Sequence, residues 1–298
     1  MVGNSMNAKP PEDSCDGVFA GYRELSTDKL GPLLDTISKR NGIPLCDFRT
    51  DILRKAVSDR MSALGTPDFT DYEKRALEDE DELDHLSKRF LISASHFFRD
   101  PFTFEFLAKL VVSALVHHKP ASPIRVWSAG CARGEEAYSM AILFAEARKT
   151  LPGAPEVFVL GTDVDQPALA RARLRVFPRE SLLEVKLGLL DEYFTPSGDG
   201  YAIREDIGAR VSFSPHDILS GTVPRVGLFT DYQLILCRNV LIYFEEKARN
   251  KAIALFERSL APGGWLVLGN SETLPEGHGP VFDEAAWGAN IFRKRDLR

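Results

Sequence analysis

The 298-residue sequence lacks several features, and each absence excludes a class of protein. Its four cysteines form neither a CxxC pair nor a Cys/His cluster, which argues against a metal site and a disulfide scaffold. No apolar run approaches the ~20 residues that cross a bilayer, and the N-terminus has no apolar signal-peptide segment. The net charge of −6 gives no basic field for nucleic acid. We therefore expect a reduced, cytoplasmic protein with no metal and no membrane insertion.

What is present is an ordinary globular composition, with 44% hydrophobic and 27% charged residues. The patterning along the chain predicts four parts. These are a disordered tail at 1–28, an all-helical domain at 29–92, a linker with a first helix at 93–122, and an α/β domain at 123–298.

In the predicted helical domain, Arg60 lies on the apolar side of the second helix. An arginine in that position must find an anion or reach a polar groove. It therefore either forms an internal salt bridge or contacts an acidic substrate. We interpret the acidic run at 78–82 as a solvated face.

From residue 123 onward, apolar runs alternate with helical segments, which is typical of a parallel sheet with helical crossovers. The predicted strands are 125–128, 157–161, 234–237 and 265–269. The predicted helices are 135–148, 167–173 and 245–260. Short strands at 201–204 and 211–214, beside a turn at 196–200, predict a small β-rich insertion at about 178–214.

The end of the first predicted strand suggests a crevice for a nucleoside. Gly130 and Gly134 bracket the turn after this strand, and glycine allows positive φ and close approach to a ligand. The next helix begins with Glu135 and Glu136, which is also ordinary helix capping. A carboxylate there competes with a pyrophosphate for the helix amides. The pattern therefore favours a cationic ligand without phosphates, such as S-adenosylmethionine, over NAD.

The end of the second predicted strand supplies an acid for the same crevice. Asp163 is placed where a carboxylate can accept both ribose hydroxyls. Asp165 is the alternative, although its position before Gln166-Pro167 also suits a helix cap.

Three further segments carry a resemblance to a known family: SASHFFRD at 93–100, CRNVLIYF at 237–244 and LGNSET at 268–273. Together with SAGCARGEEAYSMA at 128–141, they resemble the chemotaxis receptor methyltransferases, or CheR family, over about 30–294. The resemblance implies a class I S-adenosylmethionine-dependent methyltransferase fold. This is a Rossmann-like, mostly parallel sheet with an N-terminal helical domain and a small antiparallel β-subdomain.

The resemblance also implies an activity. The methyl group of S-adenosylmethionine would pass to glutamate side chains of chemoreceptor cytoplasmic helices, giving glutamyl methyl esters and S-adenosylhomocysteine. Because the reference pKa of glutamate is ~4.3, the acceptor is already an anion at neutral pH and needs no general base.

Matching positions then imply the site. The two catalytic residues are Arg99 and Tyr243, which the family places nearest the transferring methyl. The residues expected to bind the cofactor are Ser93, Ser95, Arg99, Gly130, Glu135, Asp163, Asp217, Ile218, Arg238 and Asn239. Ser93 stands at a position where the family usually has asparagine, and Asp217 at one where asparagine is common. We expect these two departures to change the affinity for the cofactor and not the methyl-transfer reaction.

Alternatives to this function remain open from the sequence. One is a methyltransferase of the same fold with another substrate, and another is a non-catalytic CheR-like adaptor that binds cofactor or receptor. Cys131 and Cys237 lie at the ends of neighbouring predicted strands. They serve either as small packing residues or as a redox pair whose oxidation would block the pocket. The turn at 196–200 is short for tethering a receptor peptide. We expect a monomer whose partner is the chemoreceptor.

Overall fold

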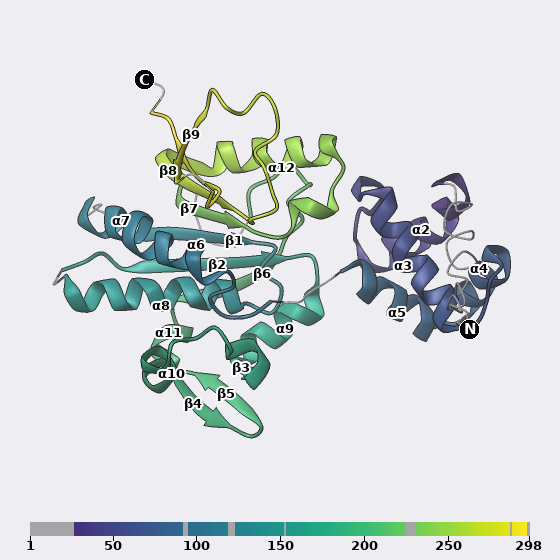
Figure 1. Ribbon diagram of the computed structural model, residues 1–298, viewed down its shortest axis with the longest axis horizontal. Coiled ribbons are helices and arrows are strands. Elements are labelled where there is room, and N and C mark those ends of the chain that lie inside the picture. Colours follow the sequence, from purple (N-terminus) through teal and green to yellow (C-terminus); the bar gives the residue numbers. More distant parts are fainter. Residues whose placement is uncertain are drawn as a thin grey trace, which may run out of the picture. The chain divides into compact units, whose positions relative to one another are not determined.

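The computed structural model describes residues 27–91, 95–118, 123–151, 153–224, 231–286 and 288–296 (Figure 1). They form two compact units, one from the residues up to Asn41 together with Thr50–Phe90, the other from Gly42–Arg49 together with the described residues from Leu91 onward. The segment Gly42–Arg49, which the sequence placed in the helical domain, thus groups with the second unit. The tail predicted at 1–28 lies outside the described residues, apart from its last two, which begin a helix.

The first unit is helical, with α2 (Thr27–Asn41), α3 (Thr50–Ala63), α4 (Phe69–Glu78) and α5 (Glu80–Phe90). The acidic run at 78–82 is divided between two helices, because α4 ends at Glu78 and α5 begins at Glu80. Asp79 separates the two helices, because its side chain accepts the amides of Asp81 and Glu82 at 3.0 and 3.3 Å.

Arg60 lies at the centre of a buried polar network in this unit. Its Nε donates to Glu82 Oε1 at 2.8 Å, and the Tyr72 hydroxyl donates to the same oxygen at 2.9 Å. Burial alone would raise the pKa of Glu82, but these hydrogen bonds hold it below its usual value. The internal salt bridge predicted for Arg60 is confirmed. The solvated face predicted for the acidic run is wrong at Glu82, which is 4% exposed.

The second unit is built on a seven-stranded sheet. Its strands are β1 (Ile124–Ala129), β2 (Val157–Asp163), β6 (Val211–Pro215), β7 (Tyr232–Cys237), β8 (Leu260–Leu268), β9 (Phe282–Ala286) and β10 (Ile291–Lys294). The strand order is β6-β2-β1-β7-β8-β10-β9. The pairs from β6 to β8 are parallel, whereas β10 is antiparallel to both neighbours. The mostly parallel sheet predicted from the sequence is confirmed.

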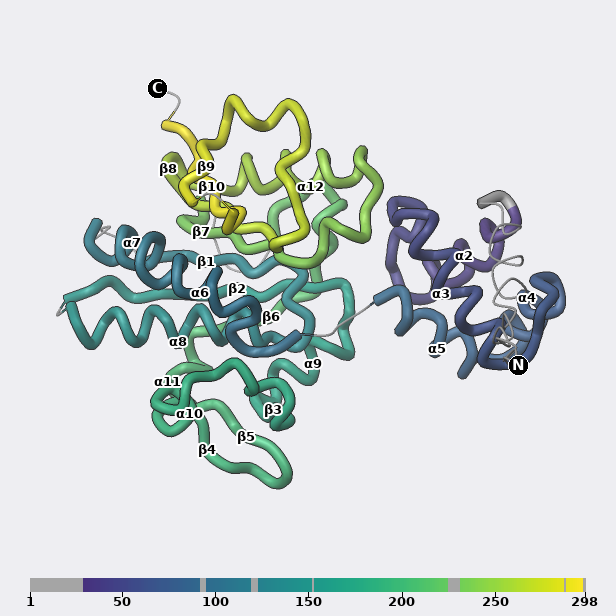
Figure 2. Tube along the Cα trace, in the orientation of Figure 1, coloured from purple at the N-terminus to yellow at the C-terminus, as the bar shows by residue number. Residues whose placement is uncertain are grey.

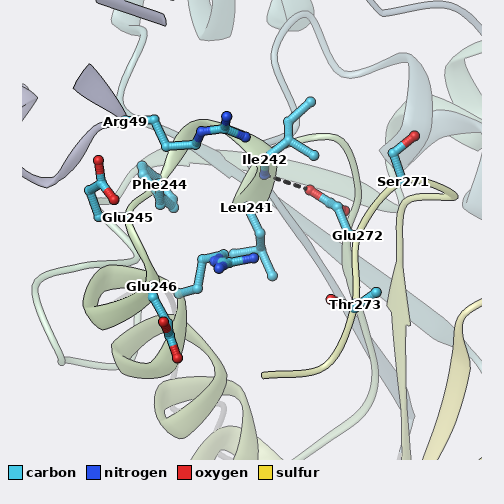
Figure 3. A pocket seen from close by; sticks show the side chains of 10 residues that line it. Arg49, Leu241, Ile242, Phe244, Glu245, Glu246, Ser271, Glu272 and Thr273 are labelled. Carbon is cyan, nitrogen blue, oxygen red and sulfur yellow. Dashed lines mark hydrogen bonds between the residues drawn. The ribbon is translucent and has the colours of Figure 1, made fainter. Parts of the chain in front are cut away.

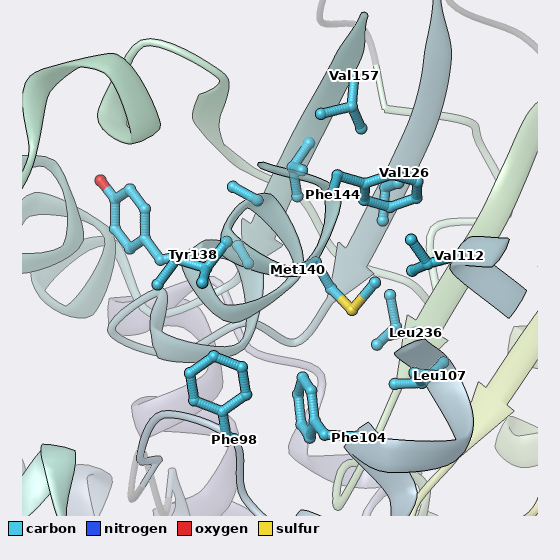
Figure 4. Close-up of a cluster of buried hydrophobic side chains, with 14 of the residues drawn as sticks. Phe98, Phe104, Leu107, Val112, Val126, Tyr138, Met140, Phe144, Val157 and Leu236 are labelled. Carbon is cyan, nitrogen blue, oxygen red and sulfur yellow. The ribbon is translucent and has the colours of Figure 1, made fainter. Parts of the chain in front are cut away.

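Helices cover both faces of this sheet (Figure 1). On one face lie α8 (Glu135–Thr150) and a helix of three segments, α6 (Pro101–Phe106), the π-helical η2 (Leu107–Val112) and α7 (Ser113–His118). In the core beneath them, Val126 and Val157 of the sheet lie near Met140 and Phe144 of α8 (Figure 4). Along β1 the side chains alternate between faces. Trp127 accordingly points the other way and packs 5.4 Å from the Phe256 ring in α12 (Glu246–Ser259).

A separate three-stranded antiparallel sheet has the order β3-β5-β4 (Figure 2). It contains β3 (Val176–Pro178), β4 (Phe194–Ser197) and β5 (Gly200–Ile203), with α9 (Gln166–Leu174) before it. The short helices η3 (Arg179–Leu182), α10 (Leu187–Tyr193) and α11 (Glu205–Gly208) complete this region. None of the helices in the described ranges is both long and apolar enough to cross a membrane.

The predicted membership of 211–214 in the β-insertion is wrong. These residues form β6, which pairs in parallel with β2 at the edge of the large sheet. Phe213 explains the placement, because its ring fills the space left by two glycines. A Cβ at Gly134 would lie 2.7 Å from this ring, and a Cβ at Gly161 would lie 2.6 Å from it.

Candidate functional site

The predicted cofactor residues from Gly130 onward meet at one edge of the large sheet. Because β1, β2, β6 and β7 are parallel, their carboxyl ends lie along the same edge. Gly130 follows β1, Asp163 ends β2, and Asp217 and Asn239 follow β6 and β7. Ligands of open α/β sheets bind in the crevice outside these strand ends.

The turn after β1 requires glycine. Gly130 has a φ of +74°, and a Cβ there would lie 2.4 Å from Val240 Cγ2. The amides of Gly130 and Cys131 both donate to the Thr162 carbonyl, at 2.8 and 2.9 Å. The turn is thus fixed to the end of β2 and packed against the loop after β7.

Glu135, the first residue of α8, carries a buried carboxyl group. The residue is fully buried, and its Oε1 accepts from Ser181 Oγ at 3.3 Å. Its Oε2 has no hydrogen-bond partner within the described residues. Burial raises the pKa of Glu135 to about 7, against the opposing effects of Arg133 and the Ser181 and Ser95 hydroxyls. The predicted Ser95 thus lies beside Glu135, whereas Ser93 lies outside the described residues.

The two acids after β2 have different roles. Asp163 accepts the Ala132 amide at 2.8 Å and the Asp165 amide at 2.9 Å, and burial raises its pKa. Asp165 accepts the Ala168 amide at 2.9 Å as the N-cap of α9. Asp165 therefore has the structural job proposed for it as an alternative, and Asp163 stays the candidate ligand.

Asp217 and Ile218 lie in the turn after β6. The Asp217 carboxylate accepts the Leu219 amide at 2.7 Å, and Ile218 is 6% exposed. The preceding residue, His216, donates its amide to the Asp163 carbonyl at 3.0 Å, which fixes this turn to the end of β2. The structure thus brings Asp217 and Ile218 to the same edge as Asp163.

Arg238 and Asn239 follow β7 and differ in orientation. The Arg238 side chain, 1% exposed, donates to Asp100 Oδ2 at 2.7 Å and to the Arg99 carbonyl at 2.9 Å. Its guanidinium therefore fixes the turn that carries Arg99, where Asp100 has a φ of +61°. Asn239 has a φ of +59°, and its buried Oδ1 accepts no hydrogen bond from any described residue.

The two residues predicted to be catalytic both lie beside the segment after β7, because Arg238 holds the Arg99 carbonyl and Tyr243 ends the short helix that follows. Burial raises the pKa of Tyr243, the positive charge of Arg99 lowers it, and the negative charge of Glu272 raises it. Tyr243 belongs to the short helix η4 (Leu241–Tyr243), and its carbonyl accepts the Arg49 amide at 2.8 Å. The Phe48 and Phe244 rings pack edge to face 5.2 Å apart beside this contact. The segment Gly42–Arg49, with η1 (Leu45–Asp47), thus supports the backbone of Tyr243.

Glu272 is a residue of this site to which the sequence assigned no role. Its carboxylate, 4% exposed, accepts four backbone amides. These belong to Gly269 at 2.6 Å, Val240 at 2.8 Å, Asn239 at 3.0 Å and Ile242 at 3.2 Å. The only signal in the sequence was its place in the LGNSET motif, which supported the resemblance without indicating these contacts.

A pocket of about 270 Å³ lies beside η4 (Figure 3). No predicted cofactor residue is among the residues that line it. The lining residues are Arg49, Leu241, Ile242, Phe244, Glu245, Glu246, Arg249, Ser271, Glu272 and Thr273.

The two cysteines at the strand ends are both buried and free. Burial raises the pKa of both Cys131 and Cys237 well above the ordinary thiol value. Because the thiolate is the reactive form, this favours the packing role over a redox pair.

Comparisons with known proteins agree with this geometry. Residues 93–287 match the family described as "CheR methyltransferase, SAM binding domain". The chain is 27% identical over 256 residues to the "Chemotaxis protein methyltransferase" of Borreliella burgdorferi, covering 84% of this chain and 89% of the relative. It is 31% identical over 196 residues to "Chemotaxis protein methyltransferase 2" of Vibrio cholerae, covering 65% and 67%.

A longer relative also matches. The "Uncharacterized 104.1 kDa protein in hypE 3'region" of Rhodobacter capsulatus is 33% identical over 259 residues, 87% of this chain. The matched region is 26% of that protein, so the chain spans about a quarter of this relative's length.

Proposed function

Because the chain belongs to the CheR methyltransferase family, we propose that it methylates glutamate side chains of chemoreceptors and so serves sensory adaptation. Its second unit has the class I S-adenosylmethionine-dependent methyltransferase fold, and S-adenosylmethionine is its cofactor. The products would be glutamyl methyl esters and S-adenosylhomocysteine, formed by a monomer in the cytoplasm.

The residues at the sheet edge fit this cofactor. Glu135 Oε2 and Asn239 Oδ1 are buried acceptors without partners among the described residues, which is unfavourable unless a ligand donates to them. An ammonium group and ribose hydroxyls are such donors, and the positive φ of Gly130 permits the tight turn that packs against Val240 beside them. We assign Glu135 to the ammonium group and Asp163 to the ribose. When bound, S-adenosylmethionine supplies an electrophilic methyl carbon.

The protein's own contribution would be orientation. Arg99 can hold one oxygen of the acceptor carboxylate through its planar guanidinium, leaving the other oxygen free to attack. The Tyr243 hydroxyl would orient the reacting groups without transferring a proton, since the acceptor is ionised at neutral pH. Holding the reactants aligned and free of water is the main catalytic task. Ser93, Ser95, Asp217, Ile218 and Arg238 complete the proposed site, with Arg238 acting through the turn that carries Arg99.

The observation that carries this proposal is that Arg238, directly after β7, donates to the Arg99 carbonyl at 2.9 Å and so holds Arg99 at the strand edge from which Tyr243 also follows. A cation and a phenol beside an acidic nucleoside crevice suit the recognition of an anionic acceptor. An adaptor without turnover would need neither group.

Radiolabelled methyl transfer from S-adenosylmethionine to membranes bearing the host's chemoreceptors tests the proposal. We expect receptor label that mild base releases as methanol, because a glutamyl ester is base-labile and an N-methyl group is not. Arg99→Ala should lower the rate at least about 100-fold by removing the carboxylate clamp. Tyr243→Phe should lower it about 10-fold.

Arg171→Ala is the matched control, because Arg171 is exposed on α9 and is not among the residues of the proposed site. Its rate should equal that of the unmodified chain. Absence of label, with S-adenosylhomocysteine binding shown by calorimetry, would refute the receptor assignment and favour the adaptor or another substrate.

A further inference from the structure

We propose that Glu272 is a positioning residue whose carboxylate holds the turn after β7, and thereby Asn239 and Tyr243, in the geometry that methyl transfer requires. The proposal rests on the proposed function, since it concerns the same site. It assigns to Glu272 neither contact with substrate nor proton transfer.

The hydrogen bonds of Glu272 leave it no capacity for another role. An ionised carboxylate offers about four acceptor positions on two oxygens. Oε1 accepts the amides of Val240 and Ile242, and Oε2 accepts those of Asn239 and Gly269 (Figure 3 shows the bond to Ile242). All positions are occupied by backbone donors, so the group acts on the backbone alone.

The turn that Glu272 holds is one that needs support. Asn239 has a φ of +59°, a sparsely populated backbone conformation that persists only where the surrounding structure imposes it. Hydrogen bonds to an ionised acceptor are roughly twice as strong as neutral ones. Since the held amides run from Asn239 to Ile242, the residue directly after them, Tyr243, takes its position from this contact.

The loop that carries Glu272 is itself anchored. Asn290, just before β10, donates its side-chain amide to the carbonyls of Gly269 and Glu272, each at 2.7 Å. Gly269 allows the close approach of the two turns, because a Cβ there would lie 2.8 Å from the Asn239 nitrogen. The antiparallel end of the sheet is therefore connected to the reaction site through Asn290 and Glu272.

Glu272→Gln in the full chain tests the proposal. Glutamine keeps the size of the side chain but turns an NH₂ donor towards two backbone N–H groups. We expect kcat for receptor methylation to fall about 10- to 100-fold, with KM for receptor unchanged within about 2-fold. We also expect faster hydrogen exchange at the amides of Asn239, Val240 and Ile242, a readout that does not depend on activity.

Two variants set the comparison. Glu276→Gln alters an exposed carboxylate on the same loop and should leave both readouts unchanged. The double variant Glu272→Gln/Tyr243→Phe should lose less than the product of the two single losses, because part of the effect of Glu272 passes through Tyr243.

Unchanged kcat and unchanged exchange in folded Glu272→Gln would overturn the proposal, and so would multiplicative losses in the double variant. Should Glu272→Gln not fold, Asn290→Ala loosens the loop from its other side and must produce the same fall in kcat with faster exchange. If the unmodified chain methylates no receptor, the proposed function fails, while the exchange measurement still decides whether Glu272 holds the turn.

Discussion

At the scale of single residues, the site depends on carboxyl groups in three different environments. Glu135 is buried and lacks a partner on one oxygen, Asp163 caps two backbone amides, and Glu272 accepts four. The same functional group thus serves as a candidate ligand to a cation, a candidate ribose acceptor and a backbone clamp. Environment rather than residue type separates these roles.

Glu135 should make cofactor affinity depend on pH. With a pKa raised to about 7, Glu135 is largely protonated at pH 6 and must lose its proton to pair with an ammonium group. Affinity for S-adenosylhomocysteine should therefore rise from pH 6 to about pH 7.5 and then level off, with proton release at the lower pH. Calorimetry in buffers of different ionisation enthalpy measures both.

Glu135→Gln should remove the pH dependence and weaken affinity about 10- to 100-fold, the loss of one charge-assisted hydrogen bond.

The contribution of Glu135 to folding stability should change with pH in the opposite direction to its contribution to cofactor affinity. The native state holds the Glu135 proton up to about pH 7 while the unfolded chain loses it near 4.5, so this group lowers stability as pH rises between those values. A variant that binds as well as the unmodified chain at every pH would contradict this role, and Glu180→Gln, on the exposed surface, is the control.

At the scale of elements, the fit of β6 against its neighbours positions the turn that carries Asp217 and Ile218. Gly161 in β2 is the clearest test of this fit. Its φ is not positive, so an added side chain there would be opposed only by steric overlap and not by backbone strain. A Cβ there would meet Phe213 Cε1 at 2.6 Å and Cys131 Sγ at 3.0 Å.

Gly161→Ala should therefore destabilise the second unit by about 1–3 kcal/mol, the usual cost of overpacking. Adding Phe213→Leu should recover part of this loss. Gly188→Ala on α10 has open space around its Cβ and should be neutral or slightly stabilising. Chemical denaturation measures all four chains, and an unperturbed Gly161→Ala would show that β6 can shift freely.

The elements that the sequence predicted are those whose pattern is local. The strands β1, β2, β7 and β8 are buried in a parallel sheet and read as apolar runs. The sequence pattern placed β6 in the small sheet instead of the large one, because the residues of a five-residue strand do not indicate which strand they pair with. The role of Glu272 could not be predicted, since it depends on the amides of a turn about 30 residues earlier in the chain. For Arg238, the match to the family motif predicted that the residue lies near the site. It did not predict that the side chain points towards Asp100 and the Arg99 carbonyl.

At the scale of the whole molecule, the chain divides into two compact units. The Arg60, Tyr72 and Glu82 network belongs to the helical unit alone. Its loss should therefore be felt in that unit and not in the methyltransferase unit.

Glu82→Gln should lower the stability of the helical unit by about 2–3 kcal/mol at pH 7. Because the native pKa of Glu82 is lowered, its stabilising contribution is present above the unfolded value near 4.5 and is lost as pH falls through the native value. The difference between variant and unmodified chain should accordingly vanish in acid. Hydrogen exchange of peptides from α3, α5 and the large sheet measures each unit, with the exposed Glu80→Gln as control.

The assignment of Gly42–Arg49 to the second unit has a consequence for how such chains can be recombined. The polypeptide passes between the units three times, after Asn41, after Arg49 and after Phe90, so no single cut separates them. An exchange of the N-terminal helices between homologues would also replace the segment Gly42–Arg49, whose Arg49 amide donates to the Tyr243 carbonyl. The helical unit therefore cannot be exchanged between homologues as an independent domain. We expect its sequence to covary with the sequence of the methyltransferase unit.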